Sequence, residues 1–156
     1  MATILKPERI TQFYDVGPGL QYWKIVISSA EVLAGNTTPI DLSAQWPAVE
    51  GVIYKVTDAF GGVETFGTAA YATNLNLRVY TEDADVVQFE SAALLASTTE
   101  RLVNLAKVDA TGATDTQHLA NKKLVIDVET GDPTAGDSDI VVYLSVTCVA
   151  VNPVSK

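Results

Sequence analysis

Residues 122–151 read KKLVIDVETGDPTAGDSDIVVYLSVTCVAV, and this stretch decides the fold because it contains two strand patterns joined by a turn-rich loop. The longer pattern runs from Asp139 to Val151, where alternate residues fall on opposite faces of an extended chain. One face is mixed, and the other is wholly apolar: Ile140, Val142, Leu144, Val146, Cys148 and Ala150. The shorter pattern, from Lys122 to Glu129, alternates in the same way. Both strands are therefore predicted to lay an apolar face on one core.

Length and charge limit the class of protein. With 156 residues the chain can build one domain with a sizeable core, but not two full domains. The 19 acidic residues outnumber the 10 basic ones, and an acidic field repels phosphate backbones and anionic membranes. Neither nucleic acid nor a membrane is therefore an expected partner. No stretch approaches the roughly 18 consecutive apolar residues of a membrane span, and residues 1–10, MATILKPERI, do not read as a secretion signal.

The apolar share of the chain suggests an interface. Hydrophobic residues make up 47% of the sequence and charged residues only 19%, which is a high apolar share for an acidic protein. Two explanations are open. A well-filled core could use all of this apolar surface, or part of the surface could contact another subunit. Under the second explanation the protein is expected to be a homo-oligomer. The interface is predicted on the mixed face of the last strand, near Val141, Tyr143, Val149 and Val151.

The rest of the chain also has the period of β-strands. Residues 1–20 are predicted to form an N-terminal arm or an edge strand, because the segment GPG at 17–19 marks a turn. Residues 21–156 are predicted to form the β-sandwich domain, with a hairpin turn at Gly61 and Gly62. Its further strands are expected in QYWKIVISS, EGVIYKVTD, VETFG, NLNLRVYTE and VVQFE.

Residues 91–106 fit two structures. Ser97 and Glu100 have the spacing of a helix capping box, whereas LVNLAKV at 102–108 alternates like a strand. A strand or a short helix at the edge of the sandwich is expected here. The chain as a whole is predicted to be all-β: a single-domain antiparallel β-sandwich of about eight or nine strands, with a jelly roll as a candidate arrangement.

Catalytic and cofactor motifs are missing from the sequence. His118 is the only histidine, so a catalytic triad would have one possible base, and no nucleophile motif such as GxSxG accompanies it. Cys148 is the only cysteine, and one histidine with one cysteine is too few ligands for a zinc site. No glycine-rich phosphate motif occurs either. The chain is therefore predicted to be no enzyme and to carry no cofactor. A hydrolase remains a minor alternative, and it would need two buried acids in one cleft.

The acidic loop at residues 130–139 has two interpretations. Asp132, Asp137 and Asp139 stand near glycines in GDPTAGDSD and could supply the hard oxygen ligands of a surface calcium site. The spacing is not that of an EF-hand, however, and aspartate and glycine also satisfy ordinary turn geometry. A solvated hairpin loop is the favoured interpretation, and calcium binding stays open.

Two stretches of the second half, NLRVYTEDADVVQFES and LVIDVETGDPTAGDSDIVVYLSV, resemble small all-β virion proteins of tailed bacteriophages that decorate or cement capsids. The resemblance implies a structural β-sandwich that binds between capsomers, often as an oligomer, and stabilises the shell. It implies contact with the major capsid protein or other virion proteins, synthesis in the host cytoplasm and a final place on the outer capsid surface. No site residue carries over, because the family offers no motif to match position by position.

The alternative function is a carbohydrate- or receptor-binding β-sandwich module of a tail fibre. Such a module binds sugars by stacking them on exposed aromatic rings. The candidate rings are those of Trp23, Trp46, Tyr71 and Tyr80. A buried Trp46 is the favoured interpretation, because isolated aromatic residues usually pack in a core.

Overall fold

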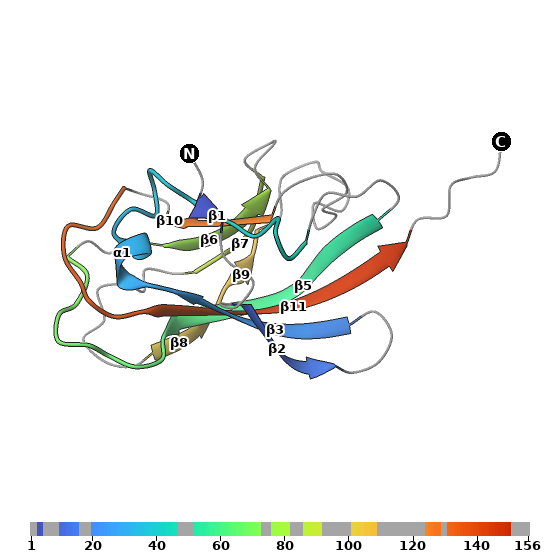
Figure 1. The fold of residues 1–156 in the computed structure, drawn as a ribbon, viewed down its shortest axis with the longest axis horizontal. Helices are drawn as coiled ribbons and strands as arrows, with labels where there is room; N and C mark the ends of the chain where they lie inside the picture. Colours follow the sequence, from blue (N-terminus) through green and yellow to red (C-terminus); the bar gives the residue numbers. More distant parts are fainter. Residues whose placement is uncertain are drawn as a thin grey trace.

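The computed structural model consists of two β-sheets packed face to face, with a short helix at one end (Figure 1). It describes residues 3–4, 10–15, 20–46, 52–72, 76–81, 86–91, 101–108, 124–128 and 131–150. One sheet contains β1 (Thr3–Ile4), β4 (Ile40–Asp41), β10 (Leu124–Val128), β6 (Leu77–Thr81), β7 (Val86–Glu90) and β9 (Ala106–Lys107), in that order. The other contains β2 (Ile10–Asp15), β3 (Leu20–Ile27), β11 (Ile140–Ala150), β5 (Val52–Val63) and β8 (Arg101–Asn104). The helix is α1 (Ser29–Val32).

The strand order is that of a jelly roll. In chain order, β3, β4, β5, β6, β7, β8, β10 and β11 can be counted as the first to the eighth strand of the sandwich. The five-stranded sheet then pairs the first, eighth, third and sixth, and the six-stranded sheet pairs the second, seventh, fourth and fifth. Two sheets joined in this order are two interlocked Greek keys. The predicted antiparallel β-sandwich is therefore confirmed. Strands β1, β2 and β9 are additions at sheet edges, and β1 pairs parallel with β4.

The core lies between the sheets and follows the predicted alternation. On β11 the inward residues Ile140, Val142, Leu144 and Val146 are at most 2% exposed. On β3 the inward residues are Trp23, Ile25 and Ile27. The opposite sheet contributes Leu77, Val79, Ile126 and Val128 to the same cluster. Burial of these alternate apolar side chains is the main driving force that holds the two sheets together.

The predicted hairpin at Gly61 and Gly62 is wrong. Strand β5 continues through both glycines, which pair with Val142 and Val141 of β11. A Cβ atom on Gly61 would lie 2.7 Å from the carbonyl oxygen of Val141, and Gly62 has a φ of 145°. The glycines therefore permit a close approach between two long central strands instead of a turn.

Residues 91–106 were predicted to form a strand or a short helix, and the structure describes strands at their C-terminal end. Strands β8 and β9 are separated only by Leu105, yet they belong to different sheets. Leu105 is buried, and its backbone amide donates to the carbonyl oxygen of Ala59 at 2.9 Å. The chain thus turns a corner of the sandwich at this residue. The residues of the predicted capping box, Ser97 and Glu100, lie outside the described residues.

The two strands within residues 1–20 lie at edges of the sheets. Strand β1 is the outermost strand of the six-stranded sheet, and β2 pairs with β3 at the edge of the five-stranded sheet. The other residues before Leu20 lie outside the described ones, so the arm or edge-strand interpretation of residues 1–20 stays a prediction.

Candidate functional site

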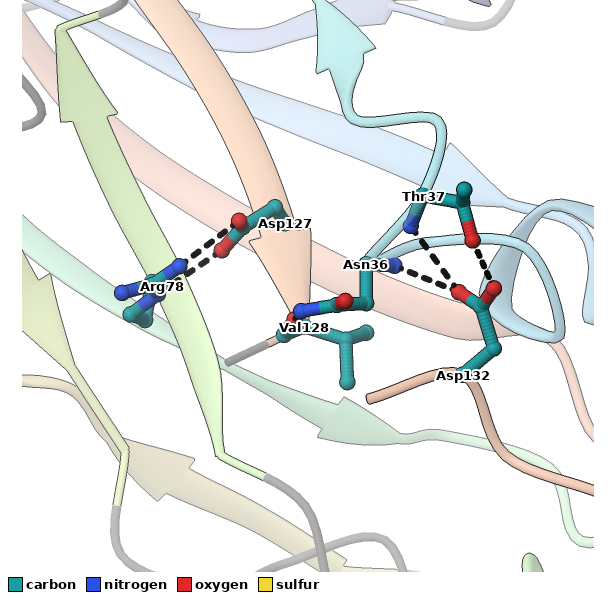
Figure 2. Close-up of polar contacts among 6 residues, drawn as sticks. All are labelled: Asn36, Thr37, Arg78, Asp127, Val128 and Asp132. Carbon is teal, nitrogen blue, oxygen red and sulfur yellow. Dashed lines mark hydrogen bonds and ion pairs between the residues drawn. The ribbon is translucent and has the colours of Figure 1, made fainter. Parts of the chain in front are cut away.

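The acidic loop fastens other loops to the end of the sandwich. Both carboxylate oxygens of Asp132 accept hydrogen bonds from the segment that follows α1 (Figure 2). The donors are the backbone amides of Asn36 and Thr37, at 2.8 and 3.0 Å, and the hydroxyl of Thr37. The side-chain amide of Asn36 in turn donates to the carbonyl oxygen of Val128 at 2.7 Å. Asp132 thus ties the helix end to the end of β10.

Asp137 and Asp139 hold two further segments. Asp137 accepts the backbone amides of Thr68 and Ala69, each at 2.9 Å, and the hydroxyl of Thr68. The Thr68 hydroxyl, followed by these amides, holds the pKa of Asp137 below its ordinary value. Asp139 accepts the backbone amide of Ser29, in the first turn of α1, at 3.0 Å. Each carboxylate therefore fixes a neighbouring segment by accepting one or more of its backbone amides.

The calcium interpretation of this loop does not agree with the structure. Asp132, Asp137 and Asp139 accept hydrogen bonds from three separate segments of the chain. Within the described residues no group of three or more histidine, cysteine, aspartate or glutamate side chains could hold a metal ion. The geometry supports the interpretation of this segment as a hairpin loop. Its aspartates also join the loop to neighbouring segments.

Three of the four aromatic candidates for sugar stacking lie in the core. Trp23 and Trp46 are 9% and 3% exposed and meet edge to face, with ring centroids 5.5 Å apart. Tyr71 is 2% exposed, and its hydroxyl donates to the carbonyl oxygen of Ser138. Burial raises the pKa of this hydroxyl. The favoured interpretation of Trp46 as a buried residue is therefore confirmed, and none of these three rings offers a stacking surface. The side chain of Tyr80 lies outside the described ones.

Two buried carboxylates were the requirement for a hydrolase, and the structure contains Asp41 and Asp127. Asp127 forms a two-pronged ion pair with Arg78 of the adjacent strand, with both bonds at 2.8 Å (Figure 2). Asp41 accepts the backbone amide of Ser43 at 2.8 Å. The hollow beside Asp127 measures only about 10 Å³, room for about one water molecule and not for a sugar. Both acids are therefore engaged in contacts within the chain.

The predicted interface on the outer face of β11 stays a prediction, and the structure describes only part of it. Val141 is only 4% exposed, and it lies at the bottom of a surface hollow. The side chain of Val149 and all of Val151 lie outside the described residues. Tyr143 is half-buried and takes part in contacts within the chain.

Tyr143 is the centre of a cluster on the outer face of the five-stranded sheet. Its ring stacks on Phe60 with centroids 4.6 Å apart and planes 9° from parallel. Its hydroxyl donates to Glu64, which also forms an ion pair with Lys24. The Lys24 ammonium lies 5.6 Å from the centroid of the Tyr143 ring, within the range of a cation–π contact. We call Lys24, Phe60, Glu64 and Tyr143 the Tyr143 cluster.

The shared carboxylate sets the titration of this cluster. The hydrogen bond from Lys24, followed by that from Tyr143, lowers the pKa of Glu64. The same carboxylate raises the pKa of Lys24 and of the Tyr143 hydroxyl. All three groups thus keep their ordinary charge states near neutral pH, which suits binding by charge and does not suit proton transfer.

A surface hollow of about 150 Å³ adjoins the Tyr143 cluster. Its lining comprises Lys24, Val26, Glu64, Thr65, Asp139 and Val141. The hollow and the cluster together form the candidate functional site. It offers an apolar floor with charged groups around it, which is the composition of a binding surface.

Phe60 and Glu64 were missed because β5 was expected to end before them. A β-bulge also reverses the alternation of β5, since Ser145 pairs with Asp58 whereas Val146 pairs with Val56. The bulge directs Ala59 into the core and Phe60 outward onto Tyr143. The paired glycines gave no signal for a continuous β5, because they fit a hairpin turn equally well.

The sequence candidates His118 and Cys148 have no described side chain. Helix α1 is far too short to cross a membrane, and no other helix of the described residues is long and apolar enough. A scan against protein-family models and a search of curated proteins both found no match to this chain.

Proposed function

We propose that this chain is a structural protein of a tailed-bacteriophage virion, a capsid decoration or auxiliary protein. It binds the head shell through protein-protein contacts and stabilises it. It acts without catalysis and without a cofactor. Its partners are the major capsid protein or other virion proteins, together with further copies of itself.

The observation that carries the proposal is that four aspartates are occupied by contacts within the chain. Asp127, Asp132, Asp137 and Asp139, which could have served chemistry, accept hydrogen bonds from the chain itself. What remains for function is a jelly roll with a mixed apolar and charged outer face. Jelly rolls recur in viral capsid proteins, and this part of the support is analogy between folds.

The charge of the chain supports a position on the outside of the head. With a net charge of -9, the protein is repelled by packaged DNA and is compatible with a surface that faces solvent. The carbohydrate-binding alternative has no such support, because three of its four aromatic residues are buried.

Binding to phage heads tests the proposal directly. Heads purified from a phage whose copy of this gene is deleted are mixed with the purified protein and sedimented. We expect saturable co-sedimentation and a higher temperature at which the heads release their DNA, because a ligand that binds only the intact shell stabilises it. Light scattering gives the mass of the free protein. A protein that is strictly monomeric and stays in the supernatant would contradict the proposal.

A further inference from the structure

Two residues that line the hollow beside the Tyr143 cluster, Val26 and Val141, belong to a row of paired residues that crosses the five-stranded sheet. Val141 of β11 pairs with Val26 of β3 on one side and with Gly62 of β5 on the other. Gly62 pairs with Leu102 of β8, so these four residues lie in one row. Leu102 is 42% exposed and is the exposed large hydrophobic residue among those described. The row thus runs from the apolar floor of the hollow to an exposed leucine at the sheet edge.

The charges around the hollow are unequal. Glu64 and Asp139 contribute two carboxylates, whereas Lys24 contributes the one ammonium group of the lining. Lys24 and Glu64 compensate each other through their ion pair. Asp139 is exposed and accepts a backbone amide through one oxygen. The hollow therefore has an excess of negative charge above a floor made by Val26 and Val141.

We propose that this hollow receives one arginine or lysine side chain of the shell protein, an inference that rests on the proposed function. A long basic side chain has an apolar stem and a charged head. The stem fits against Val26 and Val141, while the head reaches the carboxylates of Asp139 and Glu64. A volume of about 150 Å³, against about 10 Å³ for the hollow beside Asp127 that has room for one water molecule, is enough for one side chain.

Charge complementarity selects this occupant. A second copy of the chain has a net charge of -9 and would bring more negative than positive charge to the hollow. A partner with a basic residue beside an apolar patch matches both the carboxylates and the exposed Leu102. The shell protein is thus recognised by a basic side chain in the hollow and by apolar contact along the row.

The matched variants for the test are Thr65→Arg and Thr134→Arg. Thr65 is exposed and lines the hollow, so the new arginine occupies it and repels an incoming cation. Thr134 is an exposed threonine outside the lining, and its replacement makes the same change in net charge. The melting temperature of each variant reports whether the fold is kept. Asp139→Asn serves as a second variant, because it removes one charge and keeps an acceptor for the amide of Ser29.

Binding of each labelled protein to gene-deleted heads is measured as a dissociation constant. We expect Thr65→Arg to bind about tenfold more weakly or worse, Asp139→Asn a few times more weakly, and Thr134→Arg like the wild type. Equal binding by all four proteins, or equal losses for both arginine variants, would overturn the inference while leaving the proposed function standing. A loss of self-association by Thr65→Arg with unchanged head binding would identify a second copy as the occupant and also overturn it. Failure of the wild type to bind heads overturns the proposed function itself.

Discussion

The two outer faces of the sandwich each carry an ion pair, and the pairs differ in their contact with water. On the six-stranded sheet, Arg78 and Asp127 make two parallel bonds, and their side chains are 23% and 5% exposed. On the five-stranded sheet, Lys24 and Glu64 make a pair whose side chains are 30% and 41% exposed. A buried pair is held by geometry and is costly to break, whereas an exposed pair exchanges readily with solvent or a partner. Of these two pairs, the one on the five-stranded sheet is therefore the more open to water.

The largest effect is expected from Asp127→Ala. The variant leaves the guanidinium of Arg78 partly buried beside an apolar methyl group, so the free energy of unfolding should fall by about 3 kcal/mol or more. Urea denaturation measures this loss. The double variant Arg78→Met with Asp127→Leu should recover at least about half of it, because apolar residues of similar size can replace a buried pair. A loss below about 1 kcal/mol in Asp127→Ala would show that the two pairs are alike.

An intermediate effect is expected from Tyr143→Ala. The variant removes the stack on Phe60 and the hydrogen bond to Glu64, which together should cost about 1–2 kcal/mol of stability. Tyr143→Phe keeps the stack and should lose less than about half as much. Urea denaturation of the two variants separates the ring from the hydroxyl. Equal losses would place the stabilisation in the hydroxyl and would contradict this account of the Tyr143 cluster.

Breaking the exposed pair should have a small effect on stability. Lys24→Ala is expected to cost less than about 1 kcal/mol, because both side chains are open to water and the attraction is screened by salt. Denaturation at low and high salt measures the loss, which should shrink at high salt. A loss as large as that of Asp127→Ala, and independent of salt, would remove the contrast between the two faces.

The smallest effect is a change in the pH dependence of stability, and Asp137 provides it. The bonds from Thr68 and Ala69 lower the folded-state pKa of Asp137, so its stabilising contribution is complete above the unfolded-state pKa. It is lost as the pH falls through the lower folded-state value, because protonation then breaks these bonds. The melting temperatures of the wild type and Asp137→Asn should therefore differ near neutral pH and approach each other below about pH 4. A difference that does not change with pH would show that the charge of Asp137 is irrelevant.

The fold class could be predicted from the sequence because strand alternation is a local property. The apolar residues at every second position of β3 and β11 identified their buried faces, and the core confirms these faces. The same local rule failed in β5. A bulge reverses its alternation, and the pair Gly61 and Gly62 favours a hairpin when read without knowledge of the neighbouring strand.

The candidate functional site depended on contacts that no local pattern contains. Glu64 meets Tyr143 from 79 positions away, and Asp139 meets Ser29 from 110 positions away. The sequence by itself determined that alternate side chains of the long strands bury a single core, because an extended chain directs neighbouring residues to opposite sides. Only the tertiary structure decided that the acidic loop fastens other loops, that Trp23 and Trp46 pack together inside, and that the more open of the two ion pairs lies on the five-stranded sheet. The reason is physical: a carboxylate or an aromatic ring acquires its role from the partner that packing brings to it.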